Sequence, residues 1–312
     1  MSEHRRRTPV THTEQEIASQ PACWRRAAAL ATNVADVLPR PGERVAVTGC
    51  GTSWFVAQCY AALREGAGLG ETDSFSASEF PVRRHYDRVL TLSRSGTTTE
   101  VLWLLGQLRG RVPTVAITAD PHTPVMTAAD HVVVLDFADE RSVVQTRFAT
   151  SQLALLRASL GATVDGVIED AESVLRSEPP ASLVAAEQFT FLGSGWTVGL
   201  AAEAALKMRE AARAWTESYP AMEYRHGPIS IAGPGRVTWM IGAAPAGLAE
   251  DVLRAGGTFV ASDVDPMAEL VRVQRLAVAV ARAHGEDPDR PRNLTRSVIL
   301  TDAVAGSDPV TF

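Results

Sequence analysis

Short apolar runs alternate with longer amphipathic segments along most of the chain. The apolar runs predict strands at residues 44–48, 88–92, 112–118, 131–135, 189–192 and 237–241. The amphipathic or alanine-rich segments predict helices at residues 13–38, where Pro21 opens a second part, and at about 52–64, 98–108, 148–160 and 199–214. Because strands and helices alternate, we expect mainly parallel sheets with helices on both faces.

The pattern of the first half of the chain returns in the second half. The stretch VTGCGTSWFVAQCYAAL ends at Leu63, and FLGSGWTVGLAAEAALK ends at Lys207, 144 positions later. Each contains a strand, a Gly-x-Gly turn and an alanine-rich helix, which indicates a duplication. We therefore predict an α/β fold of two tandem three-layer lobes. The expected division is residues 1–40, a tail and helix; 41–175, the first lobe; 176–286, the second lobe; and 287–312, a proline-rich tail over the site.

Composition narrows the class of protein. The 312 residues are 46% hydrophobic and carry a net charge of −6, which argues against a general nucleic-acid or anionic-membrane surface. The basic run 5–7 is expected to be a solvated tail. Three cysteines without paired spacing indicate neither a disulfide framework nor a zinc site. No signal peptide or long apolar span is apparent, so we expect a cytoplasmic protein. We also expect no metal or redox cofactor.

Lys207 is the only lysine among the 30 basic Lys and Arg residues. On a helix, Glu203, Lys207 and Glu210 share one face, because they are spaced i, i+4 and i+7. Spacing alone fits a solvated stripe of ion pairs. The uniqueness of the lysine, and the position of its helix after a strand and a glycine turn, instead favour a ligand site, since ligands bind at the carboxyl ends of parallel strands.

A second candidate site is the run SRSGTTTE at residues 93–100, which follows a predicted strand. Hydroxyl groups and free N–H groups at a helix start suit a phosphate, although a simple helix cap is the alternative. Thr52 and Ser53 occupy the neighbouring strand end in the same way. The corresponding turn of the second lobe, GAAPAG at residues 242–247, has no hydroxyl. We therefore expect the first lobe to hold an anion and the second to supply acid–base groups, with His226 either a surface residue or a proton carrier.

The order of these motifs resembles the double sugar-isomerase (SIS) domain family, in particular the isomerase half of the glucosamine-6-phosphate synthases and its stand-alone relatives. The resemblance covers about residues 14–299 and implies two tandem flavodoxin-like SIS lobes. The motifs that carry it are Gly49–Ser53, Ser93–Thr98, Ala205–Glu210, His226–Pro228 and Pro291–Leu294.

The resemblance also implies roles for individual residues. The residues implied around a substrate phosphate are Ser53, Ser93, Arg94, Ser95 and Thr98. Thr52 would lie near the sugar. Glu210 would move a proton between C1 and C2 of the sugar, with Lys207 as its partner. His226 would help to open the sugar ring from the neighbouring subunit, which implies a homodimer with shared active sites.

Four departures from the synthases shape the functional prediction. Arg94 stands where they have glutamine, and Gln145 replaces a serine at the sugar end. Arg296 stands where they have a tail lysine that forms an imine, which a guanidinium cannot do. No glutaminase segment is apparent, so we expect no ammonia production from glutamine. We predict isomerisation with deamination or deglycation of a phosphorylated (amino) sugar; the alternative is a non-catalytic sugar-phosphate-binding regulator.

Overall fold

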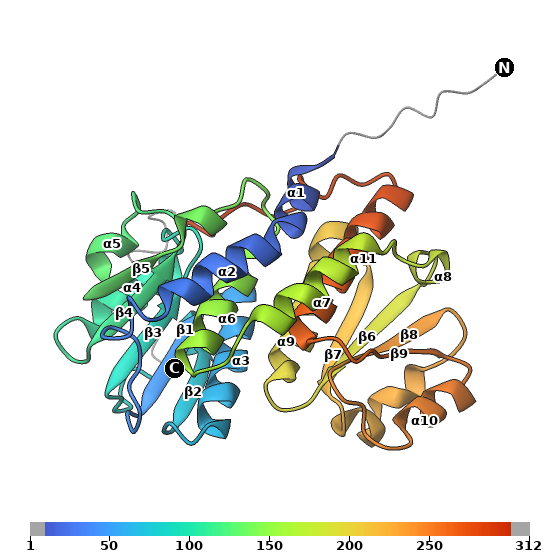
Figure 1. The fold of residues 1–312 in the computed structure, drawn as a ribbon, viewed down its shortest axis with the longest axis horizontal. Helices are drawn as coiled ribbons and strands as arrows, with labels where there is room; N and C mark the ends of the chain where they lie inside the picture. Colours follow the sequence, from blue (N-terminus) through green and yellow to red (C-terminus); the bar gives the residue numbers. More distant parts are fainter. Residues whose placement is uncertain (1–9, 301–312) are drawn as a thin grey trace.

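The computed structural model describes residues 10–300, which form two parallel sheets with helices around them (Figure 1). Residues 5–7 and the end of the predicted tail, 301–312, lie outside the described residues. The first sheet has the order β2-β1-β3-β4-β5, from β1 (Val45–Gly49), β2 (Thr72–Ser76), β3 (Arg88–Leu92), β4 (Thr114–Thr118) and β5 (His131–Val134). The second has the order β7-β6-β8-β9, from β6 (Gln188–Gly193), β7 (Trp215–Pro220), β8 (Arg236–Ile241) and β9 (Thr258–Val260). The predicted α/β fold with parallel sheets is confirmed.

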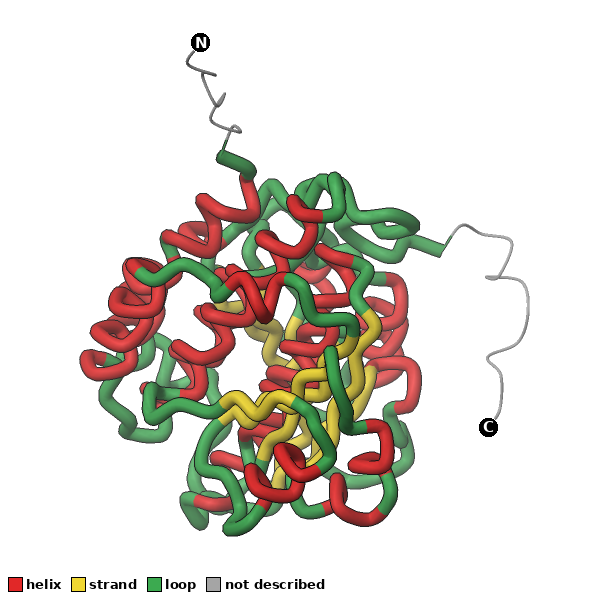
Figure 2. The backbone as a smooth tube through the Cα atoms, turned by 90° about the vertical axis from the view of Figure 1, so that its right-hand side faces the viewer, coloured by secondary structure: helices red, strands yellow, loops and turns green. Residues whose placement is uncertain are grey.

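The helices connect and cover the strands. Those of the first half are α1 (His12–Ala18), α2 (Gln20–Leu30), α3 (Thr52–Gly66), α4 (Thr99–Leu108), α5 (Val125–Ala128), α6 (Arg147–Ser159) and α7 (Asp165–Arg176). Those of the second half are α8 (Ala181–Val184), α9 (Thr197–Ala212), α10 (Leu248–Arg254) and α11 (Pro266–Ala283). Pro21 lies in the first turn of α2, as expected, but that helix ends at Leu30 rather than near residue 38. Figure 2 shows helices on both sides of the strands.

Successive side chains of a strand point to opposite faces of the sheet, so each sheet packs between two layers of helices. In β1, Val45 and Val47 belong to the core cluster that includes residues of α3, whereas Ala46 packs in a separate cluster with residues of α4. In the second sheet, Leu192 and Met240 pack in a third cluster with residues of α10. Each sheet therefore buries both faces, which is why its central strands are mostly apolar and buried along almost their whole length.

The two lobes repeat one order of elements. The series β1, α3, β2, β3, α4, β4 and α6 corresponds to β6, α9, β7, β8, α10, β9 and α11. Gly49 and Gly193 end the first strand of each series. A Cβ at Gly49 would lie 2.6 Å from Cβ of Ser53, and one at Gly193 would lie 2.3 Å from the carbonyl oxygen of Thr197. Both glycines allow the next helix to start directly against the strand end.

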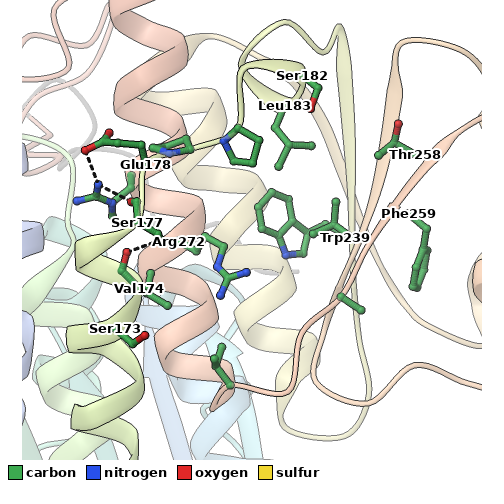
Figure 3. Close-up of a pocket in the computed structure, with 16 residues that line it drawn as sticks. Ser173, Val174, Ser177, Glu178, Ser182, Leu183, Trp239, Thr258, Phe259 and Arg272 are labelled. Atoms are coloured by element: carbon green, nitrogen blue, oxygen red, sulfur yellow. Dashed lines mark hydrogen bonds and ion pairs between the residues drawn. The ribbon is translucent and has the colours of Figure 1, made fainter.

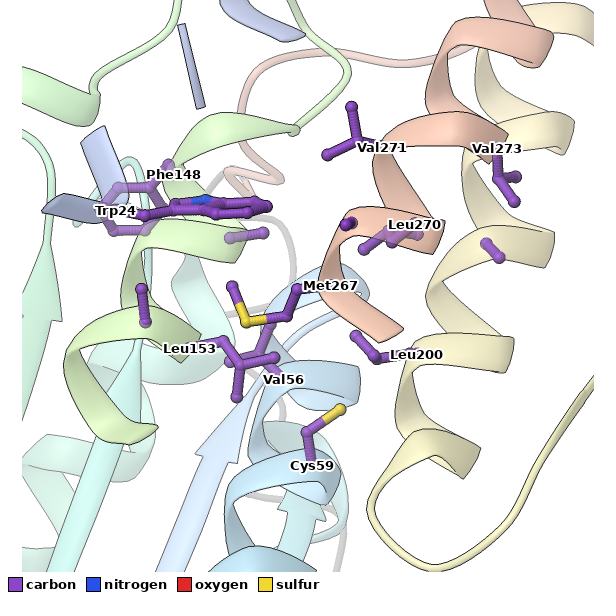
Figure 4. Close-up of a cluster of buried hydrophobic side chains, with 14 of the residues drawn as sticks. Trp24, Val56, Cys59, Phe148, Leu153, Leu200, Met267, Leu270, Val271 and Val273 are labelled. Carbon is purple, nitrogen blue, oxygen red and sulfur yellow. The ribbon is translucent and has the colours of Figure 1, made fainter. Parts of the chain in front are cut away.

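One hydrophobic cluster joins the lobes (Figure 4). It includes Trp24 of α2 and Phe148 of α6 from the first half of the chain, and Leu200 of α9 and Met267 of α11 from the second. Helices α3 and α9 pack directly on each other at Gly199, where an added Cβ would lie 2.4 Å from the carbonyl oxygen of Phe55. This close approach brings the start of α3 near the buried face of α9. No helix within residues 10–300 is long and apolar enough to span a membrane.

Candidate active site

Lys207 lies at the centre of a buried polar cluster between α9 and α3. Its side chain is 1% exposed, and its Nζ donates to Oγ1 of Thr52 at 3.0 Å. The same nitrogen pairs with Oε1 of Glu203 at 3.4 Å and with the carboxylate of Glu210. Thr52 is the first residue of α3, so the cluster connects the two lobes. Burial of the lysine rules out a solvated stripe of ion pairs.

The charges in this cluster shift one another's protonation. Burial raises the pKa of Glu203 to about 7; the nearby Glu210 charge adds to the rise and Lys207 opposes it. For Lys207, burial disfavours the charged form, but the carboxylates of Glu203 and Glu210 outweigh burial and raise its pKa. Lys207 is therefore an ammonium near neutral pH. Glu210 is the carboxylate with access to solvent, because its side chain is 19% exposed whereas that of Glu203 is 2% exposed.

The hydroxyl-rich turn at residues 93–98 lies beside the start of α3. It follows β3, whose last residue, Leu92, pairs with Gly49 of β1 in parallel register. A Cβ on Gly49 would touch both Ser53 and the carbonyl oxygen of Leu92, so the two strand ends and their turns are adjacent. The turn bends at Gly96, where φ is 61° and an added Cβ would lie 2.1 Å from Oγ1 of Thr123. Only glycine fits this position.

Four hydroxyl groups converge at the turn. Oγ of Ser297, on the C-terminal tail, lies 3.1 Å from Oγ of Ser95, 3.0 Å from Oγ1 of Thr97 and 3.5 Å from Oγ1 of Thr98. Ser93, at the start of the turn, has a buried Oγ without a hydrogen-bond partner among the described residues. Ser93, Ser95 and Thr98 were predicted from the sequence as phosphate-binding residues, whereas Thr97 was included only as part of the run at residues 93–100. Nothing in the sequence indicated Ser297.

The Arg94 side chain contacts the 140–147 loop and the C-terminal tail. Its guanidinium is 1% exposed and pairs with Oε2 of Glu140 at 3.3 Å. It also donates to three main-chain carbonyl oxygens, those of Ser142, Val143 and Arg296. The other oxygen of Glu140 accepts main-chain N–H bonds from residues 146 and 147. Arg94 and Glu140 thus hold the 140–147 loop and the tail in place.

Three further predicted site residues, Gln145, Arg296 and His226, differ in their surroundings. Gln145 lies in the 140–147 loop, and its Oε1 is buried without a hydrogen-bond partner among the described residues. Arg296 pairs with Asp139 and donates to the carbonyl oxygen of Glu140, so it fastens the tail to the first lobe. His226 is exposed at the end of a short 3₁₀ turn. Within residues 10–300, no hydrogen bond or ion pair joins His226 to the Lys207 cluster.

A separate cavity of about 610 Å³ lies in the second lobe, between β9, α11 and the α7–α8 connection (Figure 3). Trp239 and Phe259 line it, together with two arginines, but none of the predicted site residues does. Arg272 pairs with Glu269 at 3.6 Å and Arg275 with Glu178 at 3.4 Å, so the two positive charges are balanced. This cavity is a poorer phosphate site than the hydroxyl-rich turn. The described residues contain no group of three His, Cys, Asp or Glu placed to hold a metal ion.

Comparison with curated proteins finds similarity along most of the chain. It is 28% identical over 326 residues to the glutamine–fructose-6-phosphate aminotransferase (isomerizing) of Xanthomonas campestris, covering 85% of this chain and 53% of that protein. The corresponding enzyme of Methanothermobacter thermautotrophicus is 28% identical over 337 residues, covering 92% and 57%. The chain thus spans about half the length of these relatives. No protein-family model matches it.

Solved structures share the fold at lower sequence identity. A glucosamine-6-phosphate deaminase from Thermotoga maritima has a TM-score of 0.79 and 23% identity, covering 93% of this chain and all of its own. The tagatose-6-phosphate ketose/aldose isomerase of Escherichia coli has a TM-score of 0.76 and 18% identity, covering 94% and 98%. The C-terminal domain of the aminotransferase from Francisella tularensis has a TM-score of 0.77 and 19% identity, covering 93% and 100%. The resemblance that the sequence motifs indicated is confirmed.

Proposed function

Because this chain resembles the double sugar-isomerase (SIS) proteins in sequence and shares the fold of their solved structures, we propose that it is an enzyme that acts on a phosphorylated sugar. The reaction is a proton transfer between C1 and C2 of an amino-sugar phosphate that converts its amine into an imine. Water then hydrolyses the imine and releases ammonia in a deamination, or an amine in a deglycation. The observation that carries this proposal is the buried Thr52–Lys207–Glu210 cluster beside a hydroxyl-rich turn. It places acid–base groups next to an anion-binding geometry.

The phosphate is assigned to the first lobe. Ser53, Ser95 and Thr98 surround the point where two adjacent strand ends meet the start of α4, and the unpaired Oγ of Ser93 is a further donor. N–H groups at the start of a helix favour an anion there. We assign Arg94 a positioning role, because its Nη1 and Nη2 already donate to Glu140 and to three carbonyl oxygens. Its buried Nε has no partner among the described residues. The positive charge of Arg94 still favours phosphate binding through electrostatic attraction at a distance.

The chemistry is assigned to the second lobe. Glu210 removes the proton from the carbon next to the carbonyl or imine, because it is the carboxylate of the cluster with access to solvent. Lys207 remains an ammonium and stabilises the negative charge that develops on oxygen or nitrogen. Thr52 fixes the position of that ammonium. Gln145, with its unpaired Oε1, is a candidate for contact with a sugar hydroxyl or amine.

Deamination or deglycation is favoured over amino transfer by the tail. Arg296 is a guanidinium that stays protonated and therefore forms no imine with a ketose. In this chain it instead pairs with Asp139. The two curated relatives described above are aminotransferases, and one of the solved structures with the same fold is a glucosamine-6-phosphate deaminase. The nitrogen substituent is best identified by testing phosphorylated amino sugars and fructosamine phosphates for release of ammonia or amine.

The decisive experiment measures solvent deuterium entering C1 or C2 of hexose 6-phosphates and glucosamine 6-phosphate. We expect exchange with the wild-type protein, less than about a tenth of that rate with Glu210→Gln, and near-normal affinity for the sugar phosphate in that variant. Glu250→Gln, an exposed glutamate on α10, is the matched control and should exchange normally. Binding without exchange in the wild type would identify a regulator instead. Full exchange by Glu210→Gln would remove Glu210 as the base.

A further inference from the structure

The C-terminal tail places a hydroxyl group inside the turn that we assign to the phosphate. Oγ of Ser297 lies within 3.0–3.5 Å of the hydroxyl groups of Ser95, Thr97 and Thr98. Each of these groups has one proton to donate, and here Ser95 and Thr97 donate theirs to Oγ of Ser297. A phosphate oxygen is a stronger acceptor than a neutral hydroxyl, because it carries negative charge. Four converging hydroxyl groups therefore suit an anion.

The backbone of the tail is held in place without the Ser297 side chain. The N–H of Thr99 donates to the carbonyl oxygen of Val298 at 3.2 Å, and the N–H of Leu300 donates to Oγ1 of Thr99 at 2.9 Å. On the other side of Ser297, the carbonyl oxygen of Arg296 accepts from Arg94 at 3.1 Å. The Arg296 side chain pairs with Asp139. The tail thus stays on the turn when Ser297 rotates about its χ1 angle, which has several staggered positions.

We propose that Ser297 is a phosphate ligand, contributed by the tail to the site on the first lobe. When a phosphate enters, Ser95, Thr97, Thr98 and Ser297 exchange their mutual hydrogen bonds for bonds to its oxygens. The alternative, that Ser297 blocks the site, would require the tail to leave, and the tail has anchors on both sides of Ser297. This inference rests on the proposed function, because it takes the turn as the phosphate site.

The test is the affinity for inorganic phosphate and for glucose 6-phosphate, measured by isothermal titration. Loss of one hydrogen bond to a charged group should weaken both probes about tenfold or more in Ser297→Ala. Ser297→Thr keeps the hydroxyl and should retain most of the affinity. Ser159→Ala, an exposed serine at the end of α6, is the matched control and should bind as the wild type does. Equal losses for the two probes would place the contact on the phosphate rather than on the sugar.

Ser95→Ala separates failure of this inference from failure of the proposed function. If Ser95→Ala weakens binding and Ser297→Ala does not, the phosphate site stands and Ser297 is not a ligand. Tighter binding by Ser297→Ala would overturn the inference in favour of a competing tail hydroxyl. If neither variant changes the affinity, the phosphate binds elsewhere, and both proposals fail. Unchanged thermal unfolding of each variant shows that the comparison concerns binding.

Discussion

At the scale of single residues, the ammonium of Lys207 has three oxygen partners at one nitrogen. Thr52, Glu203 and Glu210 approach it from two helices, and the side chain is 1% exposed. A guanidinium is larger and planar, and directs its donors in a fixed fork. In a closed space it would either displace a partner or force the helices apart. This gives a physical reason for one lysine in a chain whose other basic residues are arginine.

We therefore expect Lys207→Arg to lower the exchange rate at least tenfold, even though the positive charge is kept. The measurement is steady-state exchange at C1 or C2 under saturating sugar phosphate. Arg254→Lys, on the surface of α10 with a side chain 74% exposed, is a control for the reverse change and should have no effect. An unchanged rate in Lys207→Arg would mean that the site needs only a positive charge.

Glu203 gives a prediction about stability and pH. Its folded pKa of about 7 lies above the value of 4.5 for an unperturbed glutamate, because burial disfavours its charge. The folded state therefore holds this proton more tightly than the unfolded state does. The resulting contribution to the free energy of unfolding is fully present below about pH 4.5 and is lost as the pH rises through about 7.

Urea unfolding of the wild type and of Glu203→Gln at pH 5 and pH 8 measures this contribution. Between these pH values the wild type should lose stability relative to the variant, by at most about 3 kcal/mol at about 1.4 kcal/mol per pKa unit. Groups that are common to both proteins contribute equally to each and cancel in the difference. A difference that stays constant with pH would show that Glu203 is already ionised at pH 5.

The sequence identified site residues whose signal is local. Lys207 and Glu210 were found from uniqueness and helical spacing, and the serines and threonines of the 93–98 turn from their density at a helix start. Glu140 and Ser297 gave no local signal, because their partners lie 46 and about 200 positions away in sequence. The direction of the Arg94 side chain depends on that distant carboxylate, so the sequence alone could not show that Glu140 and main-chain carbonyl oxygens hold this guanidinium.

At the scale of elements, the pattern of apolar and polar residues predicted the central strands of both sheets and the helices α3, α4, α6 and α9. The edge strands β2, β7 and β9 were missed, because they are short or mostly polar and only partly buried, and such strands lack a continuous apolar run. The helices α5, α7, α8, α10 and α11 were also missed. The longest of these is α11, although Asp265 caps it, Pro266 opens it and its apolar positions are regular. The missing counterpart of β5 in the second lobe follows from chain length: only residues 261–265 separate β9 from α11.

The contact between α3 and α9 gives a prediction at this scale. A Cβ at Gly199 would lie 2.4 Å from the carbonyl oxygen of Phe55 and 2.6 Å from Sγ of Cys59. Gly199→Ala should therefore push the helices apart, destabilise the protein by roughly 1–3 kcal/mol and lower activity by separating Thr52 from Lys207. Gly106→Ala is the control, because this helical glycine has open space around it and should gain about 0.5–1 kcal/mol.

Chemical denaturation and exchange assays on both glycine variants decide this point. Gly199→Ala should lose stability and activity together, whereas Gly106→Ala should keep its activity. If Gly199→Ala were as stable and active as the wild type, the approach of α3 and α9 would be looser than the structure describes. The position of Lys207 would then not depend on this contact.

At the scale of the whole molecule, the candidate site is assembled from three distant parts of the chain. The first lobe supplies the hydroxyl-rich turn, the second supplies Lys207 and Glu210, and the tail crosses back to the first lobe through Ser297. His226 alone is not brought to this site within one chain. It is exposed, and the resemblance to the synthases assigns it to the site of a neighbouring subunit. We therefore propose a two-fold dimer with two shared sites.

Mixing two inactive variants tests this assembly. In a shared-site dimer, a Glu210→Gln subunit paired with a His226→Ala subunit forms one site with both lesions and one site with neither. Random pairing after unfolding and reassembly makes half the dimers mixed, and each of these has one intact site of two. The mixture should then recover roughly a quarter of the wild-type exchange activity from two inactive parents.

The result distinguishes a shared site from one that is complete within a subunit. If Glu210 and His226 act in the same subunit, every site in the mixture keeps one lesion, and activity stays absent. Subunits with different affinity tags show that mixed dimers have formed, so an absence of activity cannot be attributed to failed reassembly. If His226→Ala alone is fully active, His226 is a surface residue, and the site needs only the groups that Lys207 and the hydroxyl-rich turn already bring together.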